Sequence, residues 1–496
     1  MRRGVEVSAL LAALPVKTVI GPLPPRVGGL TDDSRRVERG DCFVAVPGLR
    51  QDARRFVPDA LARGASLVVT EGAPLDVPVA QVVVPSARQA LALLADAYWD
   101  HPSRALTVVG ITGTNGKTTT SYLVEALLRA RGLATGVVGT IQYVVGDERR
   151  PAGQTTPEAL ELQAMLGEMR NRGVRGVAME VSSHALALSR VDGLEFDIAV
   201  FTNLTQDHLD FHGTLDEYRR AKRRLFDLLA RSPKPRRTAV INGDDPSGAE
   251  MVRGLEVPVL TFGLRGEADV RCLDYRSGLD GIQMEVETRD GRRSLGSPLI
   301  GEHNVMNLLA AAGVGQALGL GGDAIARALA GVGAVPGRFE QIRAGQPFLV
   351  VVDYAHTPDA LERVLATARK LTRGRLGVVF GCGGDRDRGK RPIMGEIAAR
   401  LCDRVWVTSD NPRSERPEAI VDEIVEGVRR ARAAEGRYVR QPDRRAAIGA
   451  ALDWAESGDT VVIAGKGHET YQIIGPQVLP FDDRDVARQI LRRTLP

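Results

Sequence analysis

The sequence predicts an α/β protein with three domains, and three observations lead to this prediction. The chain has 496 residues, which suggests about three cores at roughly 150 residues per domain. Apolar runs of strand length alternate with stretches of helical periodicity, and several runs end in glycine-rich or polar tips. We therefore expect a smaller N-terminal α/β domain (1–104), a central P-loop domain with a doubly wound parallel sheet (105–335) and a C-terminal Rossmann-like α/β domain (336–496).

The first hundred residues form a unit of their own. A short helix is expected around 8–14, followed by a Pro/Gly-rich passage at 21–29 and a turn with a strand within 30–46. Further helix and strand segments follow. The unit ends near His101 and Pro102, where we expect a linker.

The central domain opens with a predicted strand, phosphate loop and helix at 106–132. A β-branched run ends in a glycine-rich turn, and about fourteen residues of helical periodicity follow. Glycines let backbone N–H groups approach a phosphate at a helix start, while Lys117 would neutralise the outer phosphates. An ordinary glycine turn is the alternative, and the flanking strand and helix argue against it. The expected nucleotide-binding residues are Gly113, Thr114, Asn115, Gly116, Lys117, Thr118 and Thr119.

Polar side chains follow three further predicted strands of this domain. Because the carboxyl ends of parallel strands share one edge of a sheet, we expect these side chains near the phosphate loop. Carboxylates and imidazoles there suit a Mg²⁺-dependent phosphoryl reaction, although a single His or an Asn-Gly-Asp-Asp turn is often only structural. The three groups are Glu180, Ser182, Ser183 and His184; Asn203, Thr205, Asp207, His208 and His212; and Asn242, Asp244 and Asp245.

The C-terminal domain repeats the pattern with a second predicted sheet. Four apolar runs end in polar or glycine-containing tips, and the stretches between them, such as 359–371 and 419–434, have helical spacing. The mixed charges at the tips suit a zwitterionic ligand, with salt-bridged surface loops as the alternative. The tip residues are Arg386, Asn411, Arg413, Lys466, His468 and Glu469.

Composition excludes several classes of protein. The net charge is +4, from 66 basic and 62 acidic residues, so we expect no nucleic-acid partner. No run of eighteen apolar residues occurs and the start does not resemble a signal peptide, which predicts a cytoplasmic protein without membrane insertion. The four cysteines are widely spaced, which indicates buried reduced thiols rather than a zinc site or a disulfide framework.

Ten short motifs together resemble the Mur ligase family, and they span all three domains in the family's order. Within that family, they are most similar to the members that add the third residue of the peptidoglycan stem peptide. The motifs are GTNGKTT (113–119), MEVSSHAL (179–186), NLTQDHLDFHG (203–213), AK (221–222), GEHNVMN (301–307), PGRFE (336–340), DYAHTPDAL (353–361), GCGGDRDRGKRP (381–392), DNPR (410–413) and GKGHE (465–469).

The resemblance implies an ATP-dependent ligase, expected to be a monomer, with Mg²⁺ as cofactor. Its small-molecule substrates would be UDP-MurNAc-L-Ala-D-Glu, meso-diaminopimelate and ATP. A carboxylate is a poor acyl donor, so ATP would phosphorylate the free side-chain carboxylate of the D-glutamate. The amino group of diaminopimelate would then attack the acyl phosphate and form an amide.

The resemblance also implies a role for each matching residue. Those implied to bind ATP outside the phosphate loop are His303, Asn304, Arg338, Asp353, Tyr354 and His356. Those implied to bind the UDP-MurNAc-dipeptide are Ser34, Thr155, Thr156, Ser182 and Arg190. Those implied to bind the incoming amino acid are Arg386, Asp410, Asn411, Pro412, Arg413, Gly465 and Glu469. The catalytic set is Lys117, Glu180, His208 and Lys222.

The implied metal site depends on a modified lysine. An ammonium at Lys222 could not ligate a cation, but the family carbamylates this lysine with CO₂, which gives N6-carboxylysine. With Glu180, His208 and the Thr118 hydroxyl, the carbamate would complete a Mg²⁺ site. Without the resemblance, we would expect Lys222 to be a solvated surface charge.

Three other functions remain open at this stage. A ligase of the same type could add L-lysine or L-ornithine. Arg413 argues against lysine, because a guanidinium suits the second carboxylate that diaminopimelate carries and lysine lacks. A folylpolyglutamate synthetase is disfavoured by the DNPR and GKGHE motifs. A P-loop ATPase that acts as a switch would leave Glu180, His208 and Lys222 without a role.

Overall fold

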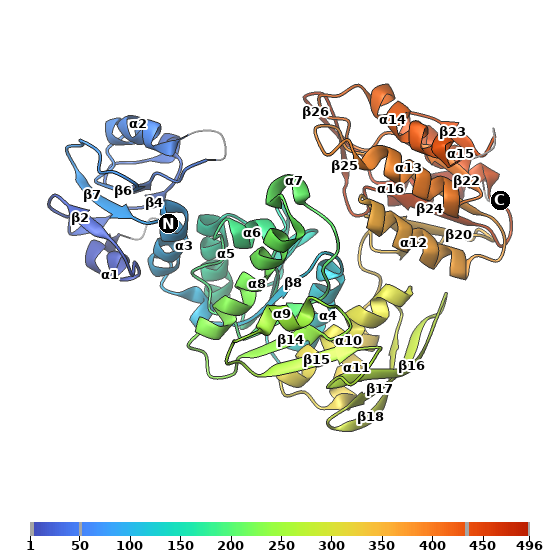
Figure 1. The fold of residues 1–496 in the computed structure, drawn as a ribbon, viewed down its shortest axis with the longest axis horizontal. Coiled ribbons are helices and arrows are strands. Elements are labelled where there is room, and N and C mark those ends of the chain that lie inside the picture. Colours follow the sequence, from blue (N-terminus) through green and yellow to red (C-terminus); the bar gives the residue numbers. More distant parts are fainter. Residues whose placement is uncertain (1–3, 49–51, 432–435, 495–496) are drawn as a thin grey trace.

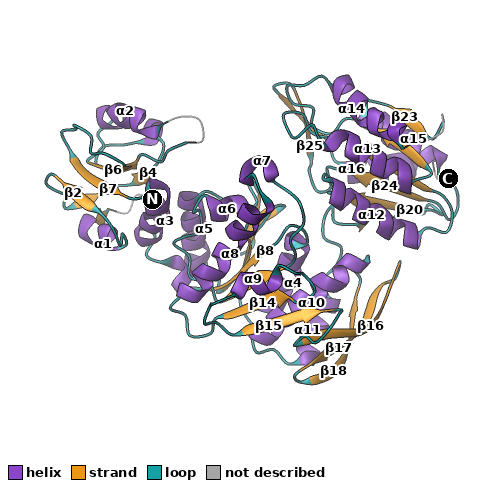
Figure 2. Cartoon of the chain, in the orientation of Figure 1, coloured by secondary structure: helices purple, strands orange, loops and turns teal. Residues whose placement is uncertain are grey.

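The structure is a computed structural model that describes residues 4–48, 52–431 and 436–494 (Figure 1). Three sheets with flanking helices follow one another along the chain, and Figure 2 shows helices packed around the strands of each. The fold class predicted from the sequence is confirmed. Among the described residues, no helix has the length and apolar character needed to cross a membrane.

The first sheet has five strands in the order β2-β7-β6-β5-β4, all parallel except the β2–β7 pair. Alternate strand residues, such as Val69 and Val68, belong to two hydrophobic clusters on opposite faces. The strands of this sheet are β2 (Thr18–Ile20), β4 (Leu30–Thr31), β5 (Cys42–Val44), β6 (Leu67–Glu71) and β7 (Ala80–Val84), and β1 (Val5–Glu6) pairs with β3 (Arg26–Val27) in a separate antiparallel sheet. The helices are α1 (Val7–Ala12), α2 (Val57–Ala62) and α3 (Ala87–Tyr98).

The central sheet has eleven strands in the order β11-β10-β9-β12-β8-β13-β14-β15-β16-β17-β18. The run from β9 to β16 is parallel, as predicted. The antiparallel strands that extend both edges were not predicted from the sequence. The strands are β8 (Thr107–Thr112), β9 (Thr135–Val138), β10 (Gln142–Val145), β11 (Glu148–Pro151), β12 (Gly176–Glu180), β13 (Ile198–Phe201), β14 (Thr238–Asn242), β15 (Val259–Gly263), β16 (Val270–Gly278), β17 (Gly281–Thr288) and β18 (Gly291–Ser297).

Helices cover both faces of the central sheet, so its parallel strands are buried on both sides. Val109 and Ile111 of β8 pack in a cluster with the apolar residues of α4 and α10, whereas Val108 packs with those of α5 and α8. The helices are α4 (Lys117–Ala130), α5 (Ala159–Asn171), α6 (Ser183–Ala187), α7 (Leu209–His212), α8 (Leu215–Arg231), α9 (Gly248–Val252), α10 (Glu302–Ala317) and α11 (Gly322–Ala330).

The third sheet has six strands in the order β19-β20-β24-β21-β22-β23, and only β19 is antiparallel to its neighbour. The four predicted apolar runs are β20, β21, β22 and β24. The predicted helix at 419–434 is α14, and 432–434 lie outside the described residues. The strands are β19 (Glu340–Gln341), β20 (Leu349–Asp353), β21 (Leu376–Phe380), β22 (Arg404–Val407), β23 (Tyr438–Arg440) and β24 (Thr460–Ala464), with a hairpin of β25 (Tyr471–Ile474) and β26 (Gln477–Pro480). The helices are α12 (Pro358–Leu371), α13 (Lys390–Leu401), α14 (Pro417–Arg430), α15 (Arg444–Trp454) and α16 (Asp483–Thr494).

The four cysteines are buried and free of disulfides, as expected from their spacing. Burial raises the pKa of the Cys42 and Cys382 thiols to about 12. They are therefore packing residues rather than reactive thiolates.

Candidate functional site

The phosphate loop has the strand-loop-helix form predicted from the sequence. It leaves β8 at Thr112 and reaches α4 through Gly116, whose φ of 88° is left-handed. A Cβ at Gly113 would overlap the Thr202 hydroxyl, so the loop depends on glycine there. The Lys117 ammonium donates to the carbonyls of Gly113 and Thr114 at 2.9 and 2.8 Å. Lys117 therefore lies against its own loop, facing the space where phosphates would bind.

A cavity of about 380 Å³ adjoins this loop, and we call it the central cavity. It brings together residues of the central domain and of the segment that follows residue 335. Predicted site residues that line it are Thr114, Asn115, Gly116, Lys117, Thr118, Thr119, Thr155, Glu180, Ser182, His208, Lys222, His303, Arg338, Asp353, Tyr354 and His356. The strand-end residues Ser183, Asn203, Asp207 and Asn242 line it as well.

Glu180 is buried at the end of β12 and anchors one wall of the central cavity. The Thr118 hydroxyl donates to Glu180 Oε2 at 2.9 Å. The backbone N–H and hydroxyl of Thr140 donate to the two carboxylate oxygens at 2.8 and 3.0 Å. Three neutral donors thus hold an anionic carboxylate in place, which is an arrangement suited to a cation.

Lys222 is buried, with a relative exposure of 1%. Its Nζ donates to the Gly113 carbonyl at 2.8 Å and lies 4.2 Å from the ring centre of Tyr218. Burial, with the nearby charge of Lys117, holds the pKa of Lys222 well below its usual value. The solvated surface charge that sequence periodicity alone would suggest is therefore wrong, because α8 turns this position toward the phosphate loop.

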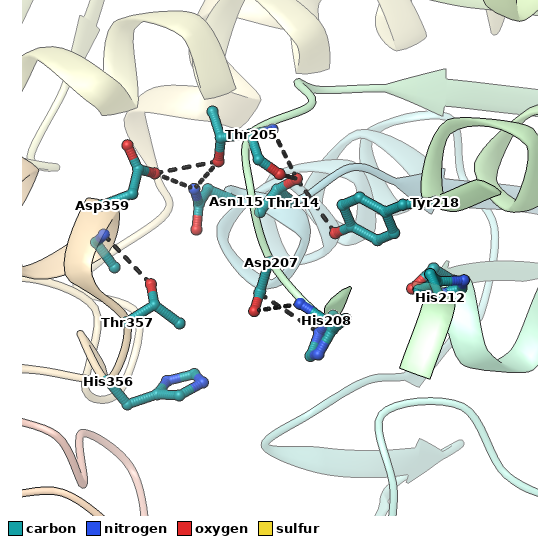
Figure 3. A network of polar contacts seen from close by, with 12 residues as sticks. Thr114, Asn115, Thr205, Asp207, His208, His212, Tyr218, His356, Thr357 and Asp359 are labelled. Atoms are coloured by element: carbon teal, nitrogen blue, oxygen red, sulfur yellow. Dashed lines mark hydrogen bonds and ion pairs between the residues drawn. The ribbon is translucent and has the colours of Figure 1, made fainter. Parts of the chain in front are cut away.

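His208 stands at the start of α7 with a left-handed φ of 54°. Asp207 holds it, since the backbone N–H of His208 donates to Asp207 Oδ1 at 2.8 Å and the ring lies near the same carboxylate (Figure 3). Burial lowers the pKa of His208, and it lowers that of the neighbouring His184 to about 4. Neutral imidazoles are the form that can ligate a metal.

The segment after residue 335 supplies a second wall. Arg338 Nη2 donates to the Thr118 hydroxyl at 3.0 Å, and its guanidinium lies 4.6 Å from the ring centre of Tyr354. The Asp353 carboxylate accepts from two backbone N–H groups, those of Phe339 and Ala355, at 2.7 and 2.8 Å. Asp353 therefore shapes this wall, while Arg338 reaches the phosphate loop.

Asp359 is a site residue that sequence reasoning missed. It lies in the first turn of α12, and its Oδ2 accepts from Asn115 Nδ2 at 3.1 Å and from the Thr205 hydroxyl at 3.2 Å (Figure 3). These contacts join the C-terminal domain to the phosphate loop. The motif DYAHTPDAL contained this residue, but only the folded chain brings it to Asn115.

Of the two α10 residues that were predicted to bind ATP, only one lines the central cavity. His303 lines the central cavity, and burial lowers its pKa to about 4. Asn304 does not line the cavity; its side chain donates to the Ile300 carbonyl at 2.7 Å and accepts from Asn307 at 2.8 Å. Asn307, one helical turn later, lines the cavity instead and also escaped the prediction.

The residues implied to bind the UDP-MurNAc-dipeptide are spread over two domains. Thr155 bonds to the Thr140 hydroxyl at 3.0 Å, and the buried Thr156 donates to the Glu180 carbonyl at 2.8 Å. Arg190 donates to the Thr156 carbonyl at 2.9 Å. Ser182 caps α6 by accepting from the Ala185 N–H. Ser34 lies in a short 3₁₀ helix of the N-terminal domain and does not line the central cavity.

The residues implied to bind the incoming amino acid surround the carboxyl ends of β21, β22 and β24, which we call the C-terminal tip. Its centre is the buried Lys466, whose Nζ donates to Glu469 at 2.9 Å and to Asn411 Oδ1 at 3.2 Å. In the described part of the chain, no hydrogen bond or ion pair engages the carboxylate of the buried Asp410. Pro412 is buried, and Gly465 has a left-handed φ of 114°.

Two arginines complete the C-terminal tip. Arg413 Nη1 donates to the Gly384 carbonyl at 2.8 Å, and the exposed Arg386 donates to the Asp385 carbonyl at 3.0 Å. The tip therefore offers carboxylates beside guanidiniums, as a zwitterionic ligand requires. None of the tip residues lines the central cavity. The His468 ring lies 5.0 Å from that of Tyr354, which lines the central cavity.

A preformed metal site of familiar type is absent from residues 4–48, 52–431 and 436–494. No group of three or more His, Cys, Asp or Glu side chains there is arranged to hold a metal ion. The residues around the central cavity fit Mg²⁺ only if Lys222 supplies an oxygen ligand, because the Glu180 carboxylate and the Thr118 hydroxyl are the hard oxygen donors of the implied set.

Comparison with known proteins identifies the family. Residues 111–315 match the Mur ligase middle domain, and residues 337–467 match the Mur ligase, glutamate ligase domain. A UDP-N-acetylmuramoyl-L-alanyl-D-glutamate–2,6-diaminopimelate ligase from Geobacillus kaustophilus is 47% identical over 470 residues, 94% of this chain and 95% of that protein. A protein of the same name from Solibacter usitatus is 48% identical over 477 residues, 95% of this chain and 96% of that protein.

A solved structure of the same description agrees with these relatives. It superposes with a TM-score of 0.70 at 36% identity and covers 99% of both chains. The two domain matches lie on the phosphate loop, the central cavity and the C-terminal tip. The chain belongs to the Mur ligase family of ATP-dependent amide ligases.

Proposed function

We propose that this chain joins meso-2,6-diaminopimelate to the D-glutamate of UDP-MurNAc-L-Ala-D-Glu, with conversion of ATP to ADP and phosphate. The observation that carries this proposal is the combination of a phosphate-loop cavity with a separate tip that contains Arg386 and Arg413. The full-length relatives are named for this reaction. The reaction belongs to the cytoplasmic synthesis of peptidoglycan precursors.

ATP would bind with its phosphates on the loop between β8 and α4. Backbone N–H groups and the α4 N-terminus would receive the phosphate oxygens, and Lys117 would turn from its loop carbonyls to the outer phosphates. Arg338 and His303, which line the same cavity, would contact the nucleotide from the hinge side. A solved MurF ligase from Thermotoga maritima, 22% identical with a TM-score of 0.61, is described as a complex with ADP, in keeping with ATP as a co-substrate.

Mg²⁺ would be held by Glu180, His208, the Thr118 hydroxyl and Lys222 as a carbamate. A neutral buried amine is the form of lysine that adds CO₂, and the resulting carbamate supplies the anionic oxygen that the site otherwise lacks. When bound, the ion would offset the repulsion between the ATP phosphates and the glutamate carboxylate. Tyr218 and Gly113 hold the Lys222 chain in place.

The remaining steps follow from what the residues can position. Thr155, Thr156, Ser182 and Arg190 would hold the dipeptide so that its free carboxylate meets the phosphate of ATP, and Ser34 would contact the UDP end. The amino group of diaminopimelate would attack the acyl phosphate, and phosphate would leave as the amide forms. Because the C-terminal tip does not line the central cavity, the third domain would have to close to bring the amine to the acyl group.

The tip would select the amino acid. The Asp410 carboxylate and Glu469 would accept from the ammonium groups, while Asn411, Pro412 and Gly465 would shape the site. Arg413 and Arg386 would receive carboxylates. The domain boundaries belong to the same proposal: 1–104 for the UDP substrate, 105–335 for ATP and 336–496 for the amino acid. Each of the three large sheets lies within one of these ranges, which supports the division.

Phosphate release by the purified protein tests this proposal. The assay contains ATP, Mg²⁺ and UDP-MurNAc-L-Ala-D-Glu, with meso-diaminopimelate, L-lysine or L-ornithine added separately. We expect stimulation by diaminopimelate only, together with a product heavier by one diaminopimelate residue. Stimulation by lysine or ornithine would keep the ligase and reject the selectivity, whereas no stimulation by any of them would favour an ATPase switch.

A further inference from the structure

We propose that Arg391 is a positioning residue for amino-acid selection, which fixes the loop carrying Arg386 against the loop carrying Arg413. This inference rests on the proposed function. It concerns a residue that supports the amino-acid-binding arginines without contacting the amino acid. Arg391 is fully buried, so it cannot touch the amino acid itself. Its influence must therefore pass through the two loops.

Arg391 lies in the first turn of α13, and its guanidinium makes four hydrogen bonds. It donates to both carboxylate oxygens of Glu415, at 2.9 and 2.8 Å, in a bidentate pair. It also donates to Glu423 at 2.8 Å and to the Gly383 carbonyl at 3.2 Å. A buried cation thus holds a carboxylate from the second loop and a carbonyl from the first. The guanidinium keeps the pKa of Glu415 low, at about 2, so the pair stays ionised.

Glu415 passes this constraint directly to the loop that carries Arg386. Its Oε1 accepts from the backbone N–H of Asp385 at 2.7 Å. The Asp385 side chain in turn accepts from the backbone N–H and hydroxyl of Ser414, at 3.2 and 2.6 Å. This series of hydrogen bonds from Arg391 through Glu415 therefore reaches Asp385, which precedes Arg386, and Ser414, which follows Arg413.

The two loops are also locked to each other near their arginines. Gly384 donates its N–H to the Asn411 carbonyl at 2.9 Å and accepts from Arg413 Nη1 at 2.8 Å. Asp385 and Arg413 both have left-handed φ values, 54° and 53°. Such conformations persist in residues other than glycine only where the surroundings hold them. The Arg391–Glu415 pair holds the Asp385 side, while the backbone of Arg413 is held by Glu415's loop and by its hydrogen bonds with Ile473 and Gly475 of the β25–β26 hairpin.

This junction leaves the arginines ready for a ligand. Among the described residues, Nε and Nη2 of Arg413 make no hydrogen bond, and Arg386 donates only to the Asp385 carbonyl. Free donors on these two guanidiniums suit the distal carboxylate of the amino acid. A shift of either loop would misalign them and weaken the preference for an amino acid with a second carboxylate.

The matched variants are Glu415→Gln and Glu423→Gln. Both remove one carboxylate from Arg391, but only Glu415 binds the backbone of the loop of Arg386, at the Asp385 N–H; Glu423 reaches that loop only through the exposed side chain of Arg388. Arg391→Lys is a third variant that keeps the charge and loses the bidentate geometry. We expect Glu415→Gln and Arg391→Lys to raise the diaminopimelate KM roughly tenfold, because a misaligned guanidinium loses a charge-assisted hydrogen bond. The KM values of ATP and the UDP substrate, and kcat, should change less than about twofold, as should every constant of Glu423→Gln.

Hydrogen–deuterium exchange of the full chain provides a second readout that does not depend on activity. We expect faster exchange of the amides at 383–386 and 410–415 in Glu415→Gln and Arg391→Lys, and no change in Glu423→Gln. Unchanged exchange there, or an equal rise in the KM of all three substrates, would overturn the inference. If the wild type uses lysine or ornithine, the proposed selectivity fails, and the same variants assayed with that amino acid still test Arg391.

Discussion

Replacing Lys222 with methionine should separate its catalytic role from any role in stability. The Gly113 carbonyl accepts from Lys222 at 2.8 Å and also from Lys117 at 2.9 Å, so it keeps a donor when Lys222 is removed. The change therefore loses one hydrogen bond, worth about 0.5–1.5 kcal/mol, and relieves the burial of an amine that has no carboxylate partner. Without substrates or Mg²⁺, we expect the free energy of unfolding to change by less than about 1 kcal/mol.

The activity of Lys222→Met should fall strongly, although its stability hardly changes. Without the Lys222 carbamate the proposed metal site loses an anionic oxygen, and we expect kcat/KM to fall by at least about 10³-fold, or roughly 4 kcal/mol of transition-state stabilisation. Phosphate release with diaminopimelate measures the activity, and urea denaturation measures the stability. A variant that keeps more than about a tenth of the wild-type rate would refute the role of Lys222.

Lys234 offers a matched control, because it is also a largely buried lysine of the same domain. Its Nζ donates to Asp197 at 2.5 Å and to the Leu106 carbonyl at 2.6 Å. Lys234→Met would leave Asp197 without its cation, which should cost about 3 kcal/mol of stability. The molecules of Lys234→Met that do fold should have the kcat/KM of the wild type. If Lys222→Met were as unstable as Lys234→Met, the lysine would be structural and the reasoning wrong.

Three further predictions concern the domain contact, the tip and acid stability. Asp359→Ala removes the acceptor of Asn115 and should raise the KM of ATP about tenfold without unfolding the chain, as steady-state kinetics and denaturation can check. Arg413→Lys should raise the diaminopimelate KM by about ten- to a hundredfold and narrow its preference over lysine in a competition assay, since an ammonium cannot pair bidentately. Burial lowers the pKa of His303 to about 4 and of His468 to about 3. Since unfolding restores an ordinary pKa near 6.5, stability should fall as pH drops from about 6.5 toward 4, and His468→Gln should flatten that slope in urea titrations.

Local patterns were enough to predict the phosphate loop and the main sheets. The strand before 113, the glycines and the helix after 117 are determined by neighbouring residues, and α4 begins and ends where the periodicity indicated. The four apolar runs of the last domain are strands for the same reason. The edge strands β10, β11, β17 and β18 pair in local hairpins, such as Val145 with Glu148 and Thr288 with Gly291. They were missed because β11 and β18 consist mostly of polar and charged residues, which carry little strand signal.

Roles within the site depended on contacts between segments far apart in the chain. Asn304 and Asn307 are both polar residues of α10, and only the packing of that helix turns Asn307 to the central cavity and Asn304 to Ile300. Asp359 reaches Asn115 across 244 positions of the chain. No pattern along the sequence encodes which of two nearby side chains faces a site built from distant segments of the chain.

The sequence by itself determined the fold class, the phosphate loop and the family to which the chain belongs, because each of these rests on residue types at short spacing. Only the tertiary structure decided the environment of individual charges. Lys222 lies in a helix with many arginines, and its sequence context predicts an exposed cation, yet α8 buries it against Gly113. Arg391 likewise reads as one basic residue among many, and the fold buries it between two loops. Burial depends on which surfaces meet, and the meeting of distant surfaces sets the chemistry of both residues.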